Sequence, residues 1–320
     1  MVMWQFKVWC SWKCKAGSRP RWDTVRVVGN PWDDLQLVDV GEGRFTTTIS
    51  EPWMLRVVPQ GGIVAAIAEA AMRTVLDVPE QALRTTSAFF VGQVQAGPVE
   101  VDVEVLRRGR SVTQLRASVR NPGATAGLTA TAVYGAPRPG FDFVDLSFPE
   151  VEPAEGLRGY RDPLPDGVEF DPGPILPFWD QVVECRPATG RAPWEPFVPD
   201  APAEIAYWYR LDDPPVGDDG TLDVAGLLVA ADTMPGAVWQ RIPPDSPPWF
   251  GPSLDLTLHV LGPAAPGWLL VHNRARVAGD GYASVESVLW DPTTRTPAAY
   301  ATQVMFFAFL DPETAPSRRG

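Results

Sequence analysis

The alternation of apolar and polar positions follows the same order in both halves of this 320-residue chain. An apolar stretch at residues 63–78 precedes several strand-like segments, and a second apolar stretch at 223–240 precedes a similar series. Gly97 and Gly267 occupy corresponding turns and are 170 positions apart. One helix followed by long antiparallel strands, written twice, predicts duplicated modules that share one sheet, because solenoid repeats are far shorter.

In the first module, apolar residues recur at helical spacing between Ile63 and Val78, and only Glu69, Arg73 and Asp77 are charged. A helix with so few charges is mostly enclosed, and its alanines allow a close approach to a sheet. Alternating patterns bounded by Gly and Pro predict the strands around it, at residues 43–50, 85–91, 99–107, 112–121 and 128–136.

The second module has the same order, with a helix from Asp223 to Gln240. Strand composition occurs at 178–186, 204–211, 253–260, 281–290 and 300–309. We therefore expect an α+β chain with a poorly ordered extension (1–34), an N-terminal module (35–150), a Pro-rich linker (151–173), a C-terminal module (174–310) and a tail (311–320). The alternative for the basic, Trp-containing extension is an amphipathic segment on a membrane surface.

Composition narrows the classes of function. A hydrophobic fraction of 45% with 13 Trp allows a large core, and no apolar run reaches the length of a membrane span. The net charge of −12 argues against nucleic acid as a partner. The three Cys and two His are not at metal-ligand spacing, so we expect no metal site, no structural zinc and a reducing, cytoplasmic location.

Asp232 is the most anomalous residue of the chain, because it follows five apolar residues in the second helix. A carboxylate on an enclosed helix must be hydrogen-bonded or have a raised pKa. The alternative is a solvent-facing Asp, or a cap for a helix that restarts at Pro235. Gln303 likewise interrupts an apolar row in the last long strand; the alternative there is a satisfied buried amide or an edge position.

The strand from Ser253 to Val260 alternates strictly. This pattern places Ser253 with Asp255 and His259 on a polar face, and the leucines, Leu254 among them, on the face that packs on a helix. His259 and His272 are the only histidines, and neither lies near a nucleophile signature such as GxSxG. Triad catalysis by Ser–His–Asp or Cys–His is therefore disfavoured.

A basic turn, LRRGRS, contains Arg107, Arg108 and Arg110 in an otherwise acidic protein. Such a turn could bind a phosphate-bearing ligand, or it could be an ordinary charged hairpin.

The motifs PQGGIVAAIAEAA (59–71), FFVGQVQAGPVEVDVEVLRRGRSV (89–112), AADTMPG (230–236), SLDLTLHVLGPAAPGWLLV (253–271), GDGYASVESVLWD (279–291) and AYATQV (299–304) occur in this order. Together they resemble the double-hotdog acyl-CoA thioesterases of the thioesterase II type, over roughly residues 35–310. The resemblance implies two helix-wrapped antiparallel sheets that form one continuous sheet. It also implies hydrolysis of an acyl-CoA thioester without a cofactor, in lipid metabolism.

By the same resemblance, Asp232, Ser253 and Gln303 hold the attacking water. Ser stands where the family more often has Thr, which keeps the hydroxyl but loses the methyl group that restrains its rotamer. Gly61 and Gly62 begin the first helix, where backbone N–H groups could stabilise an oxyanion. The arginines of the LRRGRS turn are substrate-binding candidates.

Two other functions stay open. An enoyl-CoA hydratase of the same shape would resemble its relatives in a D-x-N-P-x-H segment, which this chain lacks. A non-catalytic acyl-CoA-binding protein would keep the fold without the water site. The sequence leaves the acyl chain length, the choice between coenzyme A and acyl carrier protein, and homo-oligomerisation open.

Overall fold

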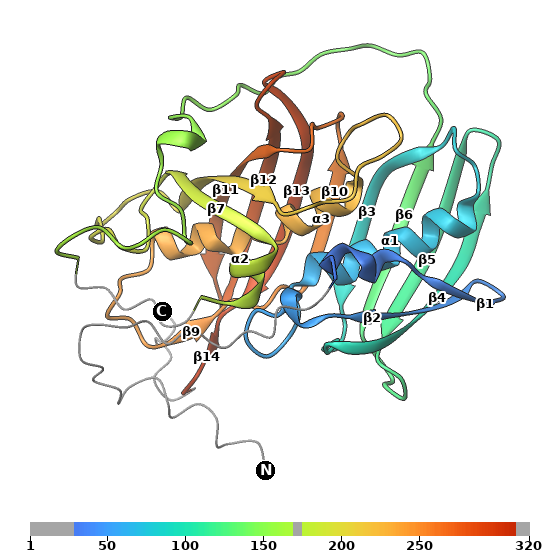
Figure 1. The fold of residues 1–320 in the computed structure, drawn as a ribbon, viewed down its shortest axis with the longest axis horizontal. Coiled ribbons are helices and arrows are strands. Elements are labelled where there is room, and N and C mark those ends of the chain that lie inside the picture. The colour runs from blue at the N-terminus through green and yellow to red at the C-terminus, as the bar shows by residue number, and fades with distance from the viewer. Residues whose placement is uncertain (1–28, 169–174, 312–320) are drawn as a thin grey trace.

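The computed structural model describes residues 29–168 and 175–311, and their strands form one large sheet and one short two-stranded sheet (Figure 1). The large sheet has 12 strands in the order β1-β2-β4-β5-β6-β3-β10-β13-β12-β11-β8-β7, with every neighbouring pair antiparallel. The six strands of the first module lie on one side of the β3–β10 junction and the six of the second module on the other. The predicted continuous sheet is confirmed.

The first module contains β1 (Val38–Gly41), β2 (Arg44–Ile49), α1 (Gly61–Leu76), β3 (Ala82–Phe90), β4 (Gly97–Arg108), β5 (Val112–Arg120) and β6 (Leu128–Gly135). The second contains α2 (Pro177–Gln181), β7 (Val183–Thr189), β8 (Glu204–Leu211), α3 (Val224–Ala231), β10 (Asp255–Val260), β11 (Trp268–Gly279), β12 (Tyr282–Asp291) and β13 (Thr296–Phe306). The two-stranded sheet pairs β9 (Trp249–Phe250) with β14 (Ala308–Phe309). Four short 3₁₀ helices complete the described chain: η2 (Pro31–Leu35), η3 (Glu51–Trp53), η4 (Ala154–Gly156) and η5 (Met234–Gln240).

The helix expected at 223–240 is divided in two. The α-helical part α3 ends at Ala231, and the chain continues as the 3₁₀ helix η5 from Met234. Pro235 has no backbone N–H and cannot extend the α-helical hydrogen bonding. The break leaves Asp232 at the C-terminal cap of α3.

The two modules are joined at the centre of the sheet and through their helices. Ser87 of β3 lies opposite Thr257 of β10, 170 positions later, and the Thr257 hydroxyl donates to the Ser87 hydroxyl at 3.0 Å. The helices α1 and α3 lie side by side on the same face of the sheet (Figure 1). The main core fills the space between these helices and the sheet.

Two boundaries differ from those expected. The extension was expected to reach residue 34, but Trp32 is buried, packs edge-on against Trp53 and donates its indole N–H to the Asp212 carbonyl. Residues 1–28 and the tail beyond 311 lie outside the described part. Residues 178–186 were expected to be one strand, but the first part is the helix α2, which Pro177 begins.

The described part of the Pro-rich linker is packed against the protein. Val151 and Leu157 pack on the outer face of the second module's sheet, in a second apolar cluster around Trp208 and Trp290. The Trp208 indole N–H donates to the Glu152 carbonyl at 2.8 Å. The linker thus covers apolar surface on the sheet face opposite the helices.

Candidate active site

Two glycines allow the start of α1 to approach the end of α3. A Cβ atom on Gly62 would lie 2.5 Å from the Leu228 carbonyl oxygen. A Cβ atom on Gly61 would lie 2.6 Å from a ring carbon of Phe90 and 2.9 Å from Oδ2 of Asp232. Glycine is therefore required at position 62, because a side chain there would force the helices apart, while a side chain at position 61 would displace the Phe90 ring or the Asp232 carboxylate. The close approach places the N-terminus of α1 against the Asp232 carboxylate.

The Asp232 carboxylate is held from both modules. Its Oδ2 accepts the Gly62 backbone N–H at 3.0 Å, and its Oδ1 accepts the Gln303 side-chain amide at 2.5 Å. The Ser253 hydroxyl lies 3.5 Å from Oδ1, at the outer limit of a hydrogen bond. The positive end of the α1 dipole adds to this stabilisation of negative charge. The three residues expected to hold a water therefore converge at one point.

Burial raises the pKa of Asp232 to about 6, above its ordinary value of 3.8. The amide of Gln303, the backbone N–H groups of Gly62 and Gly61, and the Ser253 hydroxyl partly oppose this shift, since each stabilises the charged form. The side chain is half-buried and not sealed from solvent. A carboxylate with a pKa near 6 is mostly ionised at neutral pH and is still basic enough to take a proton.

Ser253 reaches Asp232 because the pairing of β10 with β13 is irregular at this end. Thr257 lies opposite Thr302, whereas Ser253 forms a bridge with Met305. Between these two pairs the chain of β10 advances by four residues and that of β13 by only three. This one-residue bulge reverses the facing of the residues before Asp255. The strict alternation expected from the sequence is wrong here: Leu254 is 38% exposed, and Ser253 points toward the helices.

Gln303 lies on the inner face of β13, as the period-two pattern predicts. It is 1% exposed, while Val304 on the opposite face is 37% exposed. Its amide nitrogen donates to Asp232, but its Oε1 is buried and has no hydrogen-bond partner. No group of the described protein hydrogen-bonds to this oxygen, so the alternative of a fully satisfied buried amide is excluded. A free acceptor therefore lies beside the carboxylate.

The first module lacks such a site at the equivalent positions. Glu69 corresponds to Asp232, because each lies nine residues after the N-cap of its module's helix, Gln60 for α1 and Asp223 for α3. Strand pairing gives the equivalents of Ser253 and Gln303. Leu83 lies opposite Tyr134 as Ser253 lies opposite Met305, so Leu83 corresponds to Ser253. Ala132 follows Thr131 as Gln303 follows Thr302, so Ala132 corresponds to Gln303. Leu83 and Ala132 are apolar, and Glu69 is engaged by Tyr134 and Arg73, so the candidate water site is confined to the second module.

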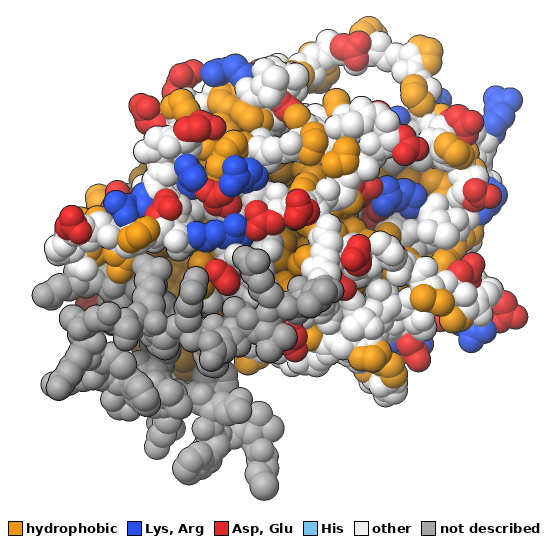
Figure 2. All heavy atoms as spheres, in the orientation of Figure 1, with side chains coloured by type: hydrophobic (Ala, Val, Ile, Leu, Met, Phe, Trp, Pro, Cys, Tyr) orange, Lys and Arg blue, Asp and Glu red, His pale blue; other side chains and the backbone are white. Residues whose placement is uncertain are grey.

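The structure places the basic turn far from this site. Arg108 donates to the carbonyls of Leu76 and Val75 at 2.8 and 3.0 Å, and so caps the C-terminus of α1. Since α1 has 16 residues, its two ends are roughly 24 Å apart. Arg107 and Arg110 are exposed on the same hairpin. On the face shown in Figure 2, basic side chains lie among acidic ones and do not form one basic patch.

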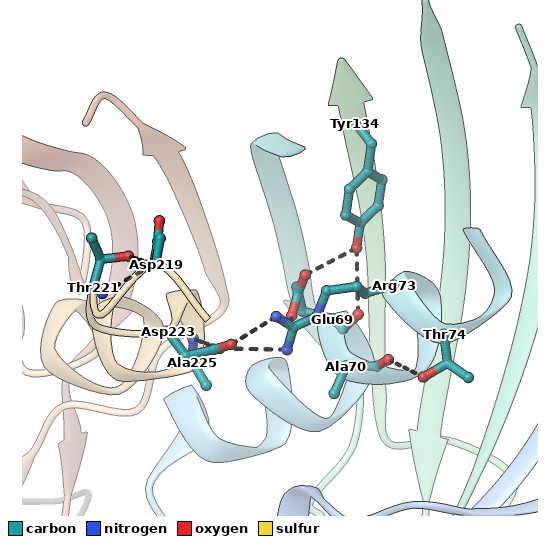
Figure 3. Close-up of polar contacts among 9 residues, drawn as sticks. All are labelled: Glu69, Ala70, Arg73, Thr74, Tyr134, Asp219, Thr221, Asp223 and Ala225. Carbon is teal, nitrogen blue, oxygen red and sulfur yellow. Dashed lines mark hydrogen bonds and ion pairs between the residues drawn. The ribbon is translucent and has the colours of Figure 1, made fainter. Parts of the chain in front are cut away.

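A second buried carboxylate, which the sequence did not single out as a site, joins α1 to α3 (Figure 3). Glu69 is 0% exposed; it accepts the Tyr134 hydroxyl at 3.2 Å and lies 3.5 Å from Arg73. Arg73 also binds Asp223, the N-cap of α3, at 2.7 Å. Burial raises the pKa of Glu69 to about 7, although Arg73 opposes the shift.

Other classes of site find no support in the described residues. Among residues 29–168 and 175–311, no group of three or more His, Cys, Asp or Glu side chains is arranged to hold a metal ion. The described helices also include none long and apolar enough to cross a membrane.

Comparison with known families and structures gives the class of protein. The family model of the acyl-CoA thioesterase N-terminal domain matches residues 49–135, and that of the C-terminal domain matches residues 154–307. These two matches cover most of the chain, and each corresponds to one of the two structural modules. The chain belongs to the acyl-CoA thioesterase family and is a thioester hydrolase.

Solved structures share the fold across nearly the whole chain. A hotdog-fold protein of unknown function from Alicyclobacillus acidocaldarius has a TM-score of 0.70 and 23% identity, over 91% of this chain and 100% of its own. An acyl-CoA thioesterase II from Mycobacterium marinum has a TM-score of 0.69 and 18% identity, over 88% and 98%. A putative thioesterase II from Thermobifida fusca has a TM-score of 0.69 and 20% identity, over 86% and 96%. No curated protein matches the sequence. The predicted double-hotdog fold is confirmed.

Proposed function

We propose that the protein hydrolyses the thioester of an acyl-CoA with a water molecule held by Asp232, Ser253 and Gln303. The observation that carries the proposal is the pairing of an Asp232 carboxylate, whose pKa is about 6, with the unpartnered Oε1 of Gln303. A water beside them donates one hydrogen to each acceptor, which aims its oxygen lone pairs at a carbonyl carbon. The Ser253 hydroxyl fixes the carboxylate or the water from the third side.

In the reaction, the water oxygen forms a bond to the thioester carbonyl carbon while Asp232 accepts the water proton. The tetrahedral intermediate then collapses, the carbon–sulfur bond breaks, and coenzyme A leaves as a thiolate that takes up a proton. Because a thiolate is a good leaving group, no strong general acid is required. The products are a free carboxylic acid and coenzyme A.

The start of α1 supplies stabilisation for the carbonyl oxygen. In the free protein, the Gly62 N–H is hydrogen-bonded to the charged Asp232. Once Asp232 has taken the water proton, it is neutral and binds this N–H less strongly. The N–H groups of Gly61 and Gly62, at the positive end of the helix, can then turn toward the oxyanion. The arginines of the LRRGRS turn are left out of the proposal, because Arg108 binds the far end of α1.

The test is the release of free thiol from a panel of acyl-CoAs by the wild type and by Asp232→Asn. The variant should keep the fold and lose activity by roughly a hundredfold or more, the scale of a removed general base. The matched control is Asp255→Asn, because that carboxylate accepts the Val304 N–H and lies outside the site. Full activity in Asp232→Asn would overturn the role of Asp232 as the base. Binding of acyl-CoA by the wild type without thiol release would favour a non-catalytic binding protein.

A further inference from the structure

Three buried polar side chains inside the second module have at least one polar atom without a hydrogen-bond partner. Asn273 and Ser287 are each 0% exposed, and Gln303 is 1% exposed. Both polar atoms of the Asn273 amide, the Ser287 hydroxyl and Oε1 of Gln303 are unpartnered. Each such group destabilises the fold when it stays unsatisfied, because it has lost its hydrogen bonds to water. Buried polar atoms in native proteins are nearly always bonded, so these atoms call for a binding partner outside the chain.

The three side chains form a continuous row across neighbouring strands. Asn273 of β11 lies directly opposite Ser287 of β12. Ser287 lies opposite Ala301 of β13, two positions before Gln303. All three share the inner face of the sheet, beneath α3 and η5. We refer to Asn273, Ser287 and Gln303 as the polar row; it leads from the candidate water site toward η5.

The first module provides an internal comparison for the polar row. Val103 lies opposite Ala117 in β4 and β5, in the same register as Asn273 and Ser287. With Ala132 at the position equivalent to Gln303, the corresponding row of the first module is apolar throughout. The fold therefore does not need polar residues here. They occur only in the module that carries Asp232.

We propose that the polar row binds a neutral oxygen substituent, a hydroxyl or keto group, on the acyl chain of the substrate. The inference rests on the proposed function and names its substrate class. A hydroxyl or keto oxygen can accept from the Asn273 amide or the Ser287 hydroxyl, and a hydroxyl can also donate to Asn273 Oδ1. No member of the row is charged, so a carboxylate substituent would be buried without a counter-charge at a high cost.

Strand spacing sets where the oxygen lies on the chain. Neighbouring strands are about 5 Å apart, so Ser287 is roughly 5 Å and Asn273 roughly 10 Å across the sheet from the strand of Gln303. An oxygen several carbons beyond the thioester carbonyl therefore meets the row, whereas one on C3 stays close to Gln303.

The test compares kcat/KM for octanoyl-CoA with that for its 3-, 5- and 7-hydroxy forms. The wild type should favour the 5- or 7-hydroxy form over octanoyl-CoA by about tenfold, the scale of one or two buried hydrogen bonds. The variant Asn273→Val with Ser287→Ala copies the first module and should lower this ratio to one or less. Each single substitution is measured as well, in case the double variant does not fold. The control is Thr113→Val, which removes an unpartnered, fully buried hydroxyl of the first module and should leave the ratio unchanged.

The outcomes separate the inference from the proposed function. If the wild type hydrolyses octanoyl-CoA but shows no preference for a hydroxyl group, or if the variants keep the preference, the row holds ordered water only and the inference is overturned. If no acyl-CoA releases thiol, the proposed function fails. The ratio of Kd values for the matching non-hydrolysable thioethers, measured by calorimetry, then decides the inference on its own.

Discussion

The acid limb of the pH profile should report the environment of Asp232. The pKa of this carboxyl is about 6, so kcat/KM should fall about tenfold per pH unit below that value as the base becomes protonated. The Gln303 amide is the strongest of the hydrogen bonds that hold this pKa down, and it lies 2.5 Å from Oδ1. Gln303→Ala should therefore raise the pKa of Asp232 and move the acid limb to higher pH.

The size of the shift follows from the energy of the lost hydrogen bond. A hydrogen bond to a charged group contributes roughly 1.5–3 kcal/mol. Since one pKa unit corresponds to about 1.4 kcal/mol, the limb should move up by roughly one to two units, less if water replaces the amide. Ser253→Ala should move it less, because that hydroxyl is 3.5 Å away. The assay is thiol release at subsaturating acyl-CoA between pH 4.5 and 9, with folding checked by circular dichroism.

Two results would refute this reasoning. If the limb of Gln303→Ala stayed at the wild-type pH or moved lower, the titrating group would not be Asp232. If Ser253→Ala shifted the limb more than Gln303→Ala did, the hydrogen-bond order described above would be wrong. A loss of activity alone would not distinguish these cases, since a damaged site loses rate at every pH.

Three further predictions concern stability, each measured by urea unfolding. Glu69→Gln should stabilise the protein by up to about 3 kcal/mol at pH 8 and little at pH 4.5. Because the pKa of Glu69 is about 7 in the folded protein, wild-type stability falls as pH rises from about 4.5 through 7. A difference in unfolding free energy between variant and wild type that shrinks with rising pH would contradict this. Gly62→Ala should cost about 1–3 kcal/mol because its Cβ meets the Leu228 carbonyl, while Gly140→Ala, with open space around it, should not. Trp32→Ala should cost about 3–5 kcal/mol, and no loss would mean that residues 30–34 do not dock.

Much of the architecture could be predicted from the sequence, because the hydrophobic pattern reports which face of each strand is buried. The strands around α1 and the inner position of Gln303 follow directly from the period of two. Asp232 could be singled out because a carboxylate after five apolar residues has few explanations. Both of these residues were recognised from local sequence alone.

The remaining features depend on contacts between distant segments. The bulge that turns Ser253 inward arises from pairing with Met305, about 50 residues away, and no local pattern reports it. Likewise, Arg108 binds the end of α1 only because β4 ends beside it, and Trp32 is buried by a loop of the other module. The polar row could have been noticed from Asn273 and Ser287, which interrupt apolar positions of their strands, but only the register shows that they are adjacent.

The contact between Gly62 and Asp232 has a consequence for how such a site can be assembled. Gly62 lies at the start of one module's helix, and Asp232 lies at the end of the other module's helix. In a symmetric dimer of identical subunits, each helix would carry both residues and the contact would occur twice. In this chain the second copy of the contact is different, because Glu69 stands at the position of Asp232 and pairs with Arg73, which binds Asp223 at the start of α3. Covalent fusion therefore lets one copy hold the candidate water site while the other joins the two helices.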